Sequence, residues 1–368
     1  MLTANATKTT PARSALLKDF IKMHGGGHAT CQPLGGDCSK RSYYRLTSQT
    51  DWLAPSVIVM DAPNTEEMQR FIKTAHFLKT HRFQAPEIYA TSDDGFILLE
   101  DFGDQTYKKA LQQHETPDVL WREMTDALMA LQARTACSPS KTANDASDTA
   151  KQQALFPYLS QDMLLSEIDI FLDWGLSFQG QALSRQEQAE VRTLWAQFLE
   201  PLYKTKDSFV LTLRDFHTEN LMRLTPPTTQ TNSDKKHTAP RLGFLDFQDA
   251  VWGPAAYDLV SLLEDVRMPF NAKRAEKLRQ SFVQNQALLP PSAFEAPYAI
   301  LSLQRATKIF GIFCRLALQE RHYKMLEYLP NICSIIEQRL ECFGKCALSD
   351  FMRNLDMSKR LALLSAGS

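Results

Sequence analysis

The alternation of apolar and polar positions predicts a strand-rich segment at the start of the chain. Short β-favouring runs occupy residues 56–60, 88–90 and 96–99. Residues 34–46 begin with an apolar residue, continue with two glycines and end in an aromatic, β-favouring run, a pattern that suits a hairpin. Residues 64–79 instead repeat apolar side chains at helical spacing. These patterns predict a small, mainly antiparallel sheet with one main helix before residue 100.

From residue 107 onward the hydrophobic period becomes that of amphipathic helices. Helices are expected at residues 119–133, 163–174, 185–202, 256–266, 272–286, 297–321 and 325–343. Residues 138–151 and the insertion at 226–241 are polar and predict loops, whereas the last twenty residues give only weak signals. The fold class predicted from these elements is α+β, with a larger, mostly helical second part.

Composition narrows the classes of protein that remain. The chain has 368 residues, which suggests about two domains. Its 41 basic and 42 acidic side chains nearly cancel, so nothing favours a nucleic-acid partner. No apolar run is long enough to span a bilayer, the first residues lack a signal-peptide core, and the seven cysteines form no CxxC pair. We therefore expect a cytoplasmic protein with free thiols, no membrane partner, and a monomeric or weakly dimeric state.

Two short apolar runs, at residues 209–211 and 243–245, each lead into a carboxylate. The first precedes Asp215, which is followed by Asn220 in an Asp-x-x-x-x-Asn spacing, and the second precedes Asp246. In kinase-type phosphoryl transfer, one aspartate accepts the proton of the acceptor hydroxyl, while an asparagine and a second aspartate hold Mg²⁺ against the phosphates. The pattern therefore predicts an enzyme that transfers a phosphoryl group.

The segments around these residues resemble the aminoglycoside phosphotransferase and choline kinase superfamily. The resemblance rests on LGGDCSKRSYYRL, SVIVMDAP, FILLEDFGD, LRDFHTENL and LDFQDAVWGPAAYDLVSLLEDVR. Together these segments are similar to the bacterial branch of anomeric N-acetylmuramate and N-acetylglucosamine kinases. Residues 1–13 are polar and are expected to be disordered. The resemblance implies a protein-kinase-like bilobal fold, with an N-lobe at 14–99, a hinge at 100–104 and a helical C-lobe at 105–368. It also implies ATP and Mg²⁺ as cofactors and a small polar acceptor, such as an amino sugar, as the other partner.

The resemblance assigns roles to single residues. Asp215 would be the catalytic base, and Asn220 and Asp246 the magnesium ligands. His217 and Asp258 would be structural, with Asp258 anchoring the catalytic loop, and Asp249 stays open between a supporting metal role and a structural one. Nucleotide binding is expected from the following residues: Gly35, Gly36, Arg41, Arg45, Glu100 and Phe102.

Two positions depart from the usual pattern of kinases. The third strand of a kinase lobe carries a lysine that pairs with the phosphates and with a helix glutamate, but here Met60 stands at that place. Another cation must then serve, with Arg41 and Arg45 as candidates, and the partner role of Glu66 or Glu67 is left open. Arg214 stands before the catalytic aspartate, where it could meet phosphate or sugar groups or form a salt bridge.

A polar face on the helix at 297–321 is a candidate acceptor site. Gln304, Lys308, Gly311 and Arg315 follow a helical repeat and share this face. Either they line a pocket for a polar, even anionic, acceptor, or they form a solvated face or an ion pair with Glu264 and Asp265. Further acceptor candidates are Arg214, Trp252 and Glu167. The functions that stay open are an amino-sugar kinase, another small-molecule kinase, and a nucleotide-binding pseudokinase.

Overall fold

The computed structural model describes residues 11–34, 41–48, 53–113, 117–136, 153–224, 241–286 and 289–366. They group into two compact units. The first unit combines the described residues up to 113 with those of 219–249, and the second combines those of 117–218 and 250–366. The chain therefore leaves the second unit after Thr218 and returns to it at Ala250, so the candidate catalytic stretch is divided between the two units.

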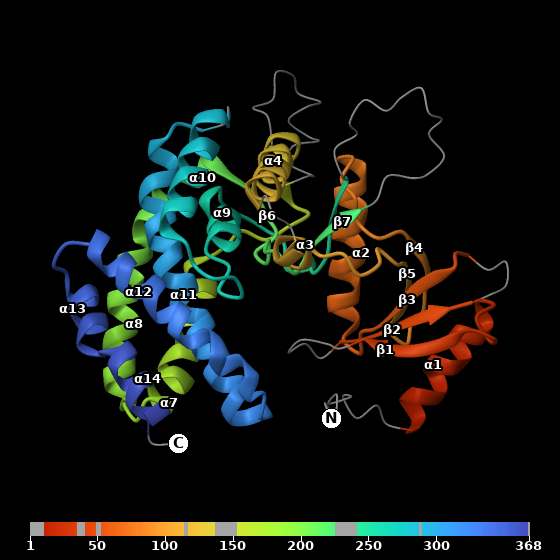
Figure 1. Cartoon of the computed structure of the whole chain (residues 1–368), viewed down its shortest axis with the longest axis horizontal. Coiled ribbons are helices and arrows are strands. Elements are labelled where there is room, and N and C mark those ends of the chain that lie inside the picture. Colours follow the sequence, from red (N-terminus) through yellow and green to blue (C-terminus); the bar gives the residue numbers. More distant parts are fainter. Residues whose placement is uncertain are drawn as a thin grey trace. The chain divides into compact units, whose positions relative to one another are not determined.

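An antiparallel sheet of five strands forms the frame of the first unit (Figure 1). Its strands are β1 (Thr30–Leu34), β2 (Ser42–Thr47), β3 (Ser56–Asp61), β4 (Ile88–Thr91) and β5 (Phe96–Glu100), in the order β1-β2-β3-β5-β4. The strands predicted at 56–60, 88–90 and 96–99 are confirmed. The hairpin predicted at 34–46 is formed by β1 and β2, and its central residues 35–40 lie outside the described part.

The described residues of the first unit form three helices: α1 (Pro11–Met23), α2 (Thr65–Thr80) and α3 (Tyr107–Gln113). Helix α1 begins at Pro11, inside the stretch 1–13 expected to be disordered, and packs Leu17, Phe20 and Ile21 onto apolar side chains of the sheet. Helix α2 is the one predicted at 64–79. Its N-cap is Asn64, whose side chain accepts hydrogen bonds from the backbone amides of the first turn.

The hairpin that follows the candidate catalytic residue also belongs to the first unit. It consists of β7 (Leu221–Leu224) and β8 (Arg241–Phe244), which pair antiparallel. The amide of Phe244 donates to the carbonyl of Gln84 at 2.8 Å, and that of Arg223 donates to the carbonyl of Gln105 at 2.8 Å. The polar insertion between the two strands lies outside the described residues.

The second unit is mostly helical and contains one two-stranded ribbon. The ribbon pairs β6 (Phe209–Thr212) with β9 (Val251–Pro254). Its helices are α4 (Pro117–Thr135), α6 (Gln161–Ile170), α7 (Leu176–Phe178), α8 (Arg185–Leu199), α9 (Ala256–Leu263), α10 (Ala272–Asn285), α11 (Ser292–Glu320), α12 (Leu329–Cys342), α13 (Ala347–Asn354) and α14 (Met357–Ala366). The helices predicted between residues 119 and 343 are thus present, whereas α13 and α14 form where the sequence signals are weak.

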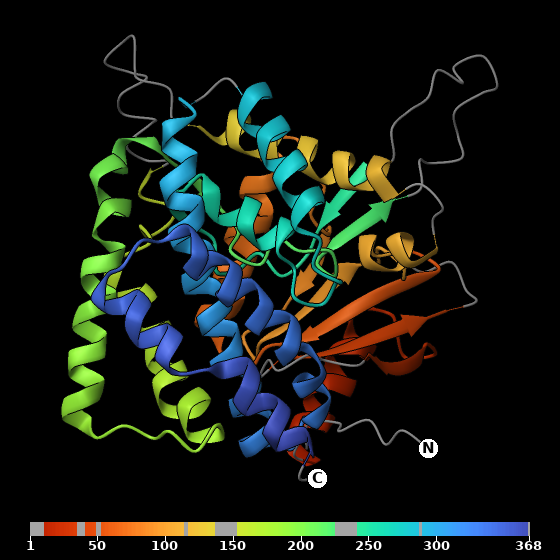
Figure 2. The same cartoon turned by 60° about the vertical axis from the view of Figure 1, so that its left-hand side comes forward.

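Helix α11 is the central element of the second unit. It contacts α6, α9 and α12, and the turned view in Figure 2 shows the C-terminal helices beside it. It also contacts the π-helical segment η1 (Phe171–Gly175), which continues α6. Most of its side chains between residues 300 and 317 are buried, including charged ones, which therefore need partners inside the protein. No helix in the described ranges is both long and apolar enough to cross a membrane.

Candidate active site

The loop after β6 places Asp215 and is fixed from helix α9. The amides of Leu213 and Arg214 donate to the two carboxylate oxygens of Asp258, at 2.7 and 2.9 Å. Arg214 has a positive φ of 71°, a conformation that is costly for a residue with a side chain. The hydroxyl of Ser261, also in α9, donates to the Arg214 carbonyl at 2.9 Å. Asp258 and Ser261 therefore hold the backbone just before Asp215 in a conformation that it would not otherwise prefer.

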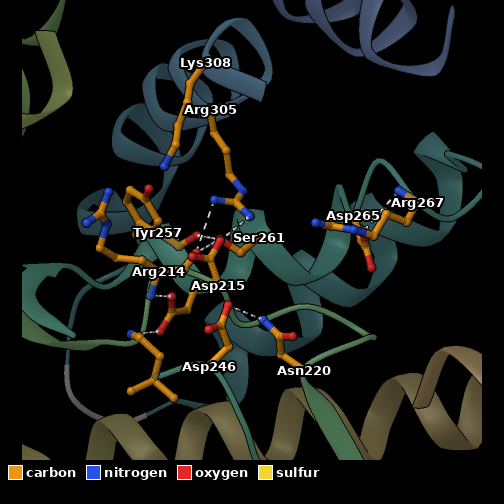
Figure 3. A network of polar contacts seen from close by, with 12 residues as sticks. Arg214, Asp215, Asn220, Asp246, Tyr257, Ser261, Asp265, Arg267, Arg305 and Lys308 are labelled. Carbon is orange, nitrogen blue, oxygen red and sulfur yellow. Dashed lines mark hydrogen bonds and ion pairs between the residues drawn. The ribbon is translucent and has the colours of Figure 1, made fainter. Parts of the chain in front are cut away.

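Helix α11 brings a positive charge to Asp215 (Figure 3). Nη2 of Arg305 lies 3.5 Å from Oδ1 of Asp215, and Nη1 donates to the Arg214 carbonyl at 3.2 Å. Burial by itself would raise the pKa of Asp215, but Arg305 and, to smaller extents, Lys308, His217 and Arg214 lower it below its usual range. The Asp215 carboxylate is therefore ionised throughout the physiological pH range.

Glu167 of α6 contacts three of the polar side chains that the sequence placed near the acceptor. Its Oε1 lies 2.7 Å from Nζ of Lys308, and its Oε2 accepts from Nε2 of Gln304 at 2.9 Å. Arg214 forms a salt bridge with the same carboxylate. Glu167 and Lys308 are only 7% and 9% exposed. Of the two alternatives for Arg214, the salt bridge is the one observed. The partner of Lys308 is Glu167 rather than Glu264 or Asp265, the acidic pair that follows α9.

That acidic pair has other partners. Glu264 forms a salt bridge with Arg339 and accepts a hydrogen bond from Ser302. Asp265 accepts from the amide and the hydroxyl of Thr218, at 3.2 and 2.6 Å, and so fixes the end of the catalytic loop that Asp258 does not reach. The expected ion pair between the polar helix face and Glu264 or Asp265 is wrong, because both carboxylates are held by residues elsewhere in the second unit.

His217 lies within this loop and is buried. Its amide donates to the Asp215 carbonyl at 3.0 Å. Burial and the nearby Arg267 lower its pKa to about 3, so the imidazole is neutral at pH 7. A buried, neutral histidine suits the structural role that the sequence assigned to it.

In the first unit, Asp246 and Asn220, the two predicted magnesium ligands, lie close to each other. Oδ2 of Asp246 lies 3.5 Å from the Asn220 side-chain nitrogen, and rotating that amide would turn its oxygen toward the carboxylate. No cluster of three or more His, Cys, Asp or Glu side chains with metal-ligand geometry occurs among the described residues. One carboxylate and one amide oxygen fit Mg²⁺, which keeps few protein ligands and takes the rest from phosphates and water.

Arg41, just before β2, forms salt bridges with two carboxylates of the first unit. Its Nη2 lies 2.6 Å from Oδ1 of Asp246, and its Nε lies 3.1 Å from Oε1 of Glu67 in α2. Met60, which stands at the lysine position of kinases, is fully buried opposite Tyr43 of β2. Arg41 therefore makes the pairing with a helix glutamate that a kinase lysine makes from the third strand. Glu67, rather than Glu66, is its partner.

Arg45, the other candidate cation, instead contacts the segment predicted to be the hinge. It binds both carboxylate oxygens of Asp101, at 2.7 and 3.0 Å, and Oδ1 of Asp104 at 2.9 Å. The ring of Phe102 packs against Gly243 of β8, and the Glu100 side chain accepts from the Glu87 amide at 3.1 Å. These contacts shape residues 100–104. The nucleotide roles of Arg45, Glu100 and Phe102 stay predictions, and Gly35 and Gly36 lie outside the described residues.

The remaining candidates lie in less informative surroundings. Trp252 in β9 is buried, packs edge-on against Phe156 and donates to the Gln153 carbonyl at 2.9 Å. Asp249 lies 3.6 Å from Arg70 of α2 in the first unit. Arg315 is partly buried near the far end of α11. Acceptor roles for Trp252, Lys308, Arg315, Arg214 and Glu167 stay predictions.

Sequence reasoning missed Arg305 and Asp265 as site residues. Arg305 is three residues before Lys308 on α11, so a helical projection could have grouped the two. The projection cannot say which carboxylate each cation meets, because Glu167 and Asp215 come from segments distant in sequence. Asp265 gives no local signal that it accepts two hydrogen bonds from Thr218.

Comparison with known proteins supports the chemistry that this geometry suggests. A curated protein of Caulobacter vibrioides named N-acetylmuramate/N-acetylglucosamine kinase is 27% identical, covering 92% of this chain and 94% of its own. A protein of the same name from Pseudomonas putida is 28% identical, covering 88% of each chain. A third, from Neisseria meningitidis, is 29% identical and covers 82% of this chain and 83% of its own.

Solved structures with the same fold are phosphotransferases acting on small molecules. An aminoglycoside phosphotransferase with bound ADP superposes with a TM-score of 0.54 at 15% identity, covering 89% of this chain and 98% of that one. A choline kinase from Streptococcus pneumoniae gives 0.53 at 12% identity, covering 95% and 99%. The fold is therefore the expected kinase-like α+β fold. The model of the phosphotransferase enzyme family matches residues 30–287, so this chain belongs to that family and is an ATP-dependent phosphotransferase.

Proposed function

We propose that this chain is a Mg²⁺- and ATP-dependent kinase that phosphorylates an amino sugar. The proposed acceptor is N-acetylmuramate, N-acetylglucosamine or both, and the proposed position is the anomeric hydroxyl. This activity would serve the recycling of peptidoglycan sugars in the cytoplasm. The observation that carries the proposal is the set Asp215, Asn220 and Asp246 in a chain that aligns along most of its length with relatives of that name.

Asp215 is the proposed contact for the acceptor hydroxyl. An ionised carboxylate accepts a hydrogen bond from the hydroxyl, aims its oxygen at the phosphoryl group and takes the proton as transfer completes. Its lowered pKa makes it a weak base, which suffices because a loose transition state requires little early proton removal. Asn220 and Asp246 would hold Mg²⁺, which when bound supplies neutralisation of phosphate charge. Arg41 would bind the phosphates while Glu67 orients it.

The Arg41–Glu67 pair bears on the pseudokinase alternative. The absence of a lysine at Met60 motivated that alternative, because without a cation there the phosphates would lack a partner. A guanidinium is permanently charged and can bind phosphate oxygens through two parallel N–H groups. Arg41 can therefore take over the function of the lysine, and the missing lysine no longer favours a protein without activity.

Charges around Asp215 bear on the class of acceptor. Arg214, Arg305 and Lys308 lie in the same polar network, and Glu167 is shared by two of them. A polycationic aminoglycoside would bring several ammonium groups toward these cations, which costs free energy. A neutral or anionic sugar meets no such repulsion. This feature supports an amino sugar that is N-acetylated, and hence uncharged at nitrogen, over an aminoglycoside.

The test is a phosphorylation assay with Mg²⁺ and ATP on a panel of acceptors. The panel contains N-acetylmuramate, N-acetylglucosamine, unmodified hexoses, choline and kanamycin, and the phosphorylated position is read by NMR. Asp215→Ala is assayed in parallel and is expected to lower kcat by about 10² to 10⁴. Asp118→Ala is the matched control, because Asp118 forms only a surface ion pair with Lys277, 3.9 Å away.

The expected result is a phosphate on the anomeric oxygen of an N-acetylated sugar, with the activity lost in Asp215→Ala and kept in Asp118→Ala. Turnover on choline or kanamycin alone would replace the proposed acceptor while leaving the mechanism in place. Full activity in Asp215→Ala would refute the role of Asp215. Tight ATP binding without turnover on any acceptor would favour the pseudokinase.

A further inference from the structure

Arg305 differs from the other cations near Asp215 in the partners that it contacts. It is 5% exposed, and its guanidinium lies 5.8 Å from the ring centre of Tyr257. One nitrogen donates to the Arg214 carbonyl at 3.2 Å while another lies 3.5 Å from the Asp215 carboxylate (Figure 3). A single side chain thus contacts both the backbone before the catalytic residue and its functional group.

The charges in this network can be assigned to pairs. Lys308 and Arg214 both pair with Glu167, and Asp258 is engaged by two backbone amides. The charged and titratable groups that face Asp215 within the second unit are Arg305, Lys308, Arg214, His217 and Asp258. Among the carboxylates of the described residues, Asp215 is the one in salt-bridge range of Arg305. Burial raises the pKa of the Asp258 carboxyl and Arg305 partly opposes that rise, but Asp215 is the carboxylate that the Arg305 guanidinium meets at ion-pair distance.

We propose that Arg305 is a positioning residue for phosphoryl transfer, which orients the Asp215 carboxylate and offsets its charge as the phosphoryl group approaches. This inference rests on the proposed function, because it requires Asp215 to contact the acceptor hydroxyl. A free carboxylate rotates about its side-chain bonds and repels the negative phosphoryl oxygens. A fixed guanidinium opposes both effects without reorganising during the reaction.

The buried position explains why this role belongs to Arg305 rather than to a substrate-binding residue. Its guanidinium is almost fully enclosed by α9, α11 and the catalytic loop, so it acts on the substrate through Asp215. Its planar fork holds N–H donors in fixed directions on separate nitrogens, whereas the donors of a lysine all lie on one freely rotating nitrogen. Loss of the side chain should therefore affect the transfer step more than nucleotide binding.

The experiment compares Arg305→Ala, Arg305→Lys and the native enzyme on the acceptor that the panel identifies. We expect Arg305→Ala to lower kcat by about 10², as loss of one preorganised donor does, with an unchanged KM for ATP. Arg305→Lys restores the charge but not the fork, so its kcat should be about tenfold above that of Arg305→Ala. Thermal unfolding midpoints are recorded for all variants. If Arg305→Ala does not fold, Arg305→Gln, which is neutral and keeps a donor, takes its place.

Arg339→Ala is the matched control. Arg339 of α12 is also a largely buried arginine; it pairs with Glu264 and donates to Ser302 of α11 at 2.8 Å, but it does not contact the catalytic loop. Its loss should lower the melting temperature and leave kcat unchanged.

The proposal is overturned if Arg305→Ala has native kcat or if Arg305→Lys has no higher kcat than Arg305→Ala. It is also overturned if the loss of kcat in Arg305→Ala and Arg305→Lys follows their loss of stability. An inactive Asp215→Ala beside a fully active Arg305→Ala would refute only this inference, whereas a fully active Asp215→Ala would refute the role of Asp215 on which it rests. Absence of turnover by the native enzyme on every acceptor would instead refute the proposed function.

Discussion

At the scale of single residues, the first unit has no lysine at position 60, but it has Arg41 immediately before the neighbouring strand β2. In the β2–β3 register Tyr43 lies opposite Met60, and Arg41 precedes Tyr43 by two residues. Strand geometry places residues two apart on the same face, so Arg41 reaches the region that a lysine at position 60 would serve. The long guanidinium side chain then spans to Glu67 and Asp246.

This arrangement predicts different effects for substitutions of Arg41, which lies just before β2, and of Arg45, which lies within it. Arg41→Ala should raise the KM for ATP and lower kcat/KM by about 10² to 10³, because a charge-assisted phosphate contact and the partner of two carboxylates are lost together. Arg45→Ala tests the competing candidate, since Arg45 pairs with Asp101 and Asp104 rather than with Glu67 and Asp246. Steady-state kinetics with varied ATP provide the measurement. Equal effects of the two substitutions would contradict the assignment of the phosphate cation to Arg41.

At the scale of elements, the contact between α11 and η1 determines where Glu167 and Lys308 meet. Gly311 of α11 faces the backbone of η1, and a Cβ built there would lie 2.5 Å from Cα of Phe171 and 2.6 Å from its nitrogen. The close approach requires glycine, because neither backbone can move without disturbing a whole helix. Helix α6, which carries Glu167, continues directly into η1, so the same contact sets the distance between Glu167 and α11.

Gly311→Ala should therefore destabilise the protein, although alanine is the better helix former. Overpacking of this kind costs about 1–3 kcal/mol, which exceeds the gain of about 1 kcal/mol from helix propensity. Gly344→Ala is the control, because a Cβ there meets nothing within 4 Å. Urea unfolding gives both free energies. A neutral or stabilising Gly311→Ala would show that α11 and η1 can separate without cost.

At the scale of the whole molecule, buried titratable groups couple the stability of the fold to pH. His217 has a pKa of about 3 in the folded protein, because of burial and then Arg267, against about 6.5 in an unfolded chain. Its contribution to stability is therefore complete above pH 6.5 and is lost as the pH falls toward 3. Burial raises the pKa of Asp258 to about 7, so its contribution changes in the opposite direction, decreasing as the pH rises from about 4 to 7.

The contribution of His217 can be isolated by difference. His217→Gln removes one titrating group and leaves Asp258 in place, so the free energy of unfolding of the variant should fall less steeply between pH 6.5 and 4.5 than that of the native protein. The difference in slope is at most about 1.4 kcal/mol per pH unit. Urea unfolding of both proteins at several pH values measures it. Parallel curves would mean that the folded protein binds a proton at His217 as readily as the unfolded chain does.

The sequence by itself determined the secondary structure and the chemistry. Strands with alternating or continuous apolar runs and helices with a 3.6-residue period depend on local side-chain spacing, which is written in the chain. The same holds for the Asp-x-x-x-x-Asn spacing after β6 and for the carboxylate after β8, since a strand followed by a tight loop presents its next residues in a fixed order. Helices α13 and α14 were not predicted because they are only 8 and 10 residues long and because their burial depends on contacts with α8 and α12.

Only the tertiary structure decided which charges pair. The sequence placed Lys308 and Gln304 on one face of α11, but it could not show that α6 would bring Glu167 to them, or that Arg305 would meet Asp215 instead. Likewise the sequence left both Arg41 and Arg45 as candidates for the phosphate-binding cation. In the fold, Arg41 pairs with Glu67 and Asp246, whereas Arg45 pairs with Asp101. Ion pairing depends on distances between segments far apart in the chain, and these distances are set by the packing of helices and strands rather than by local pattern.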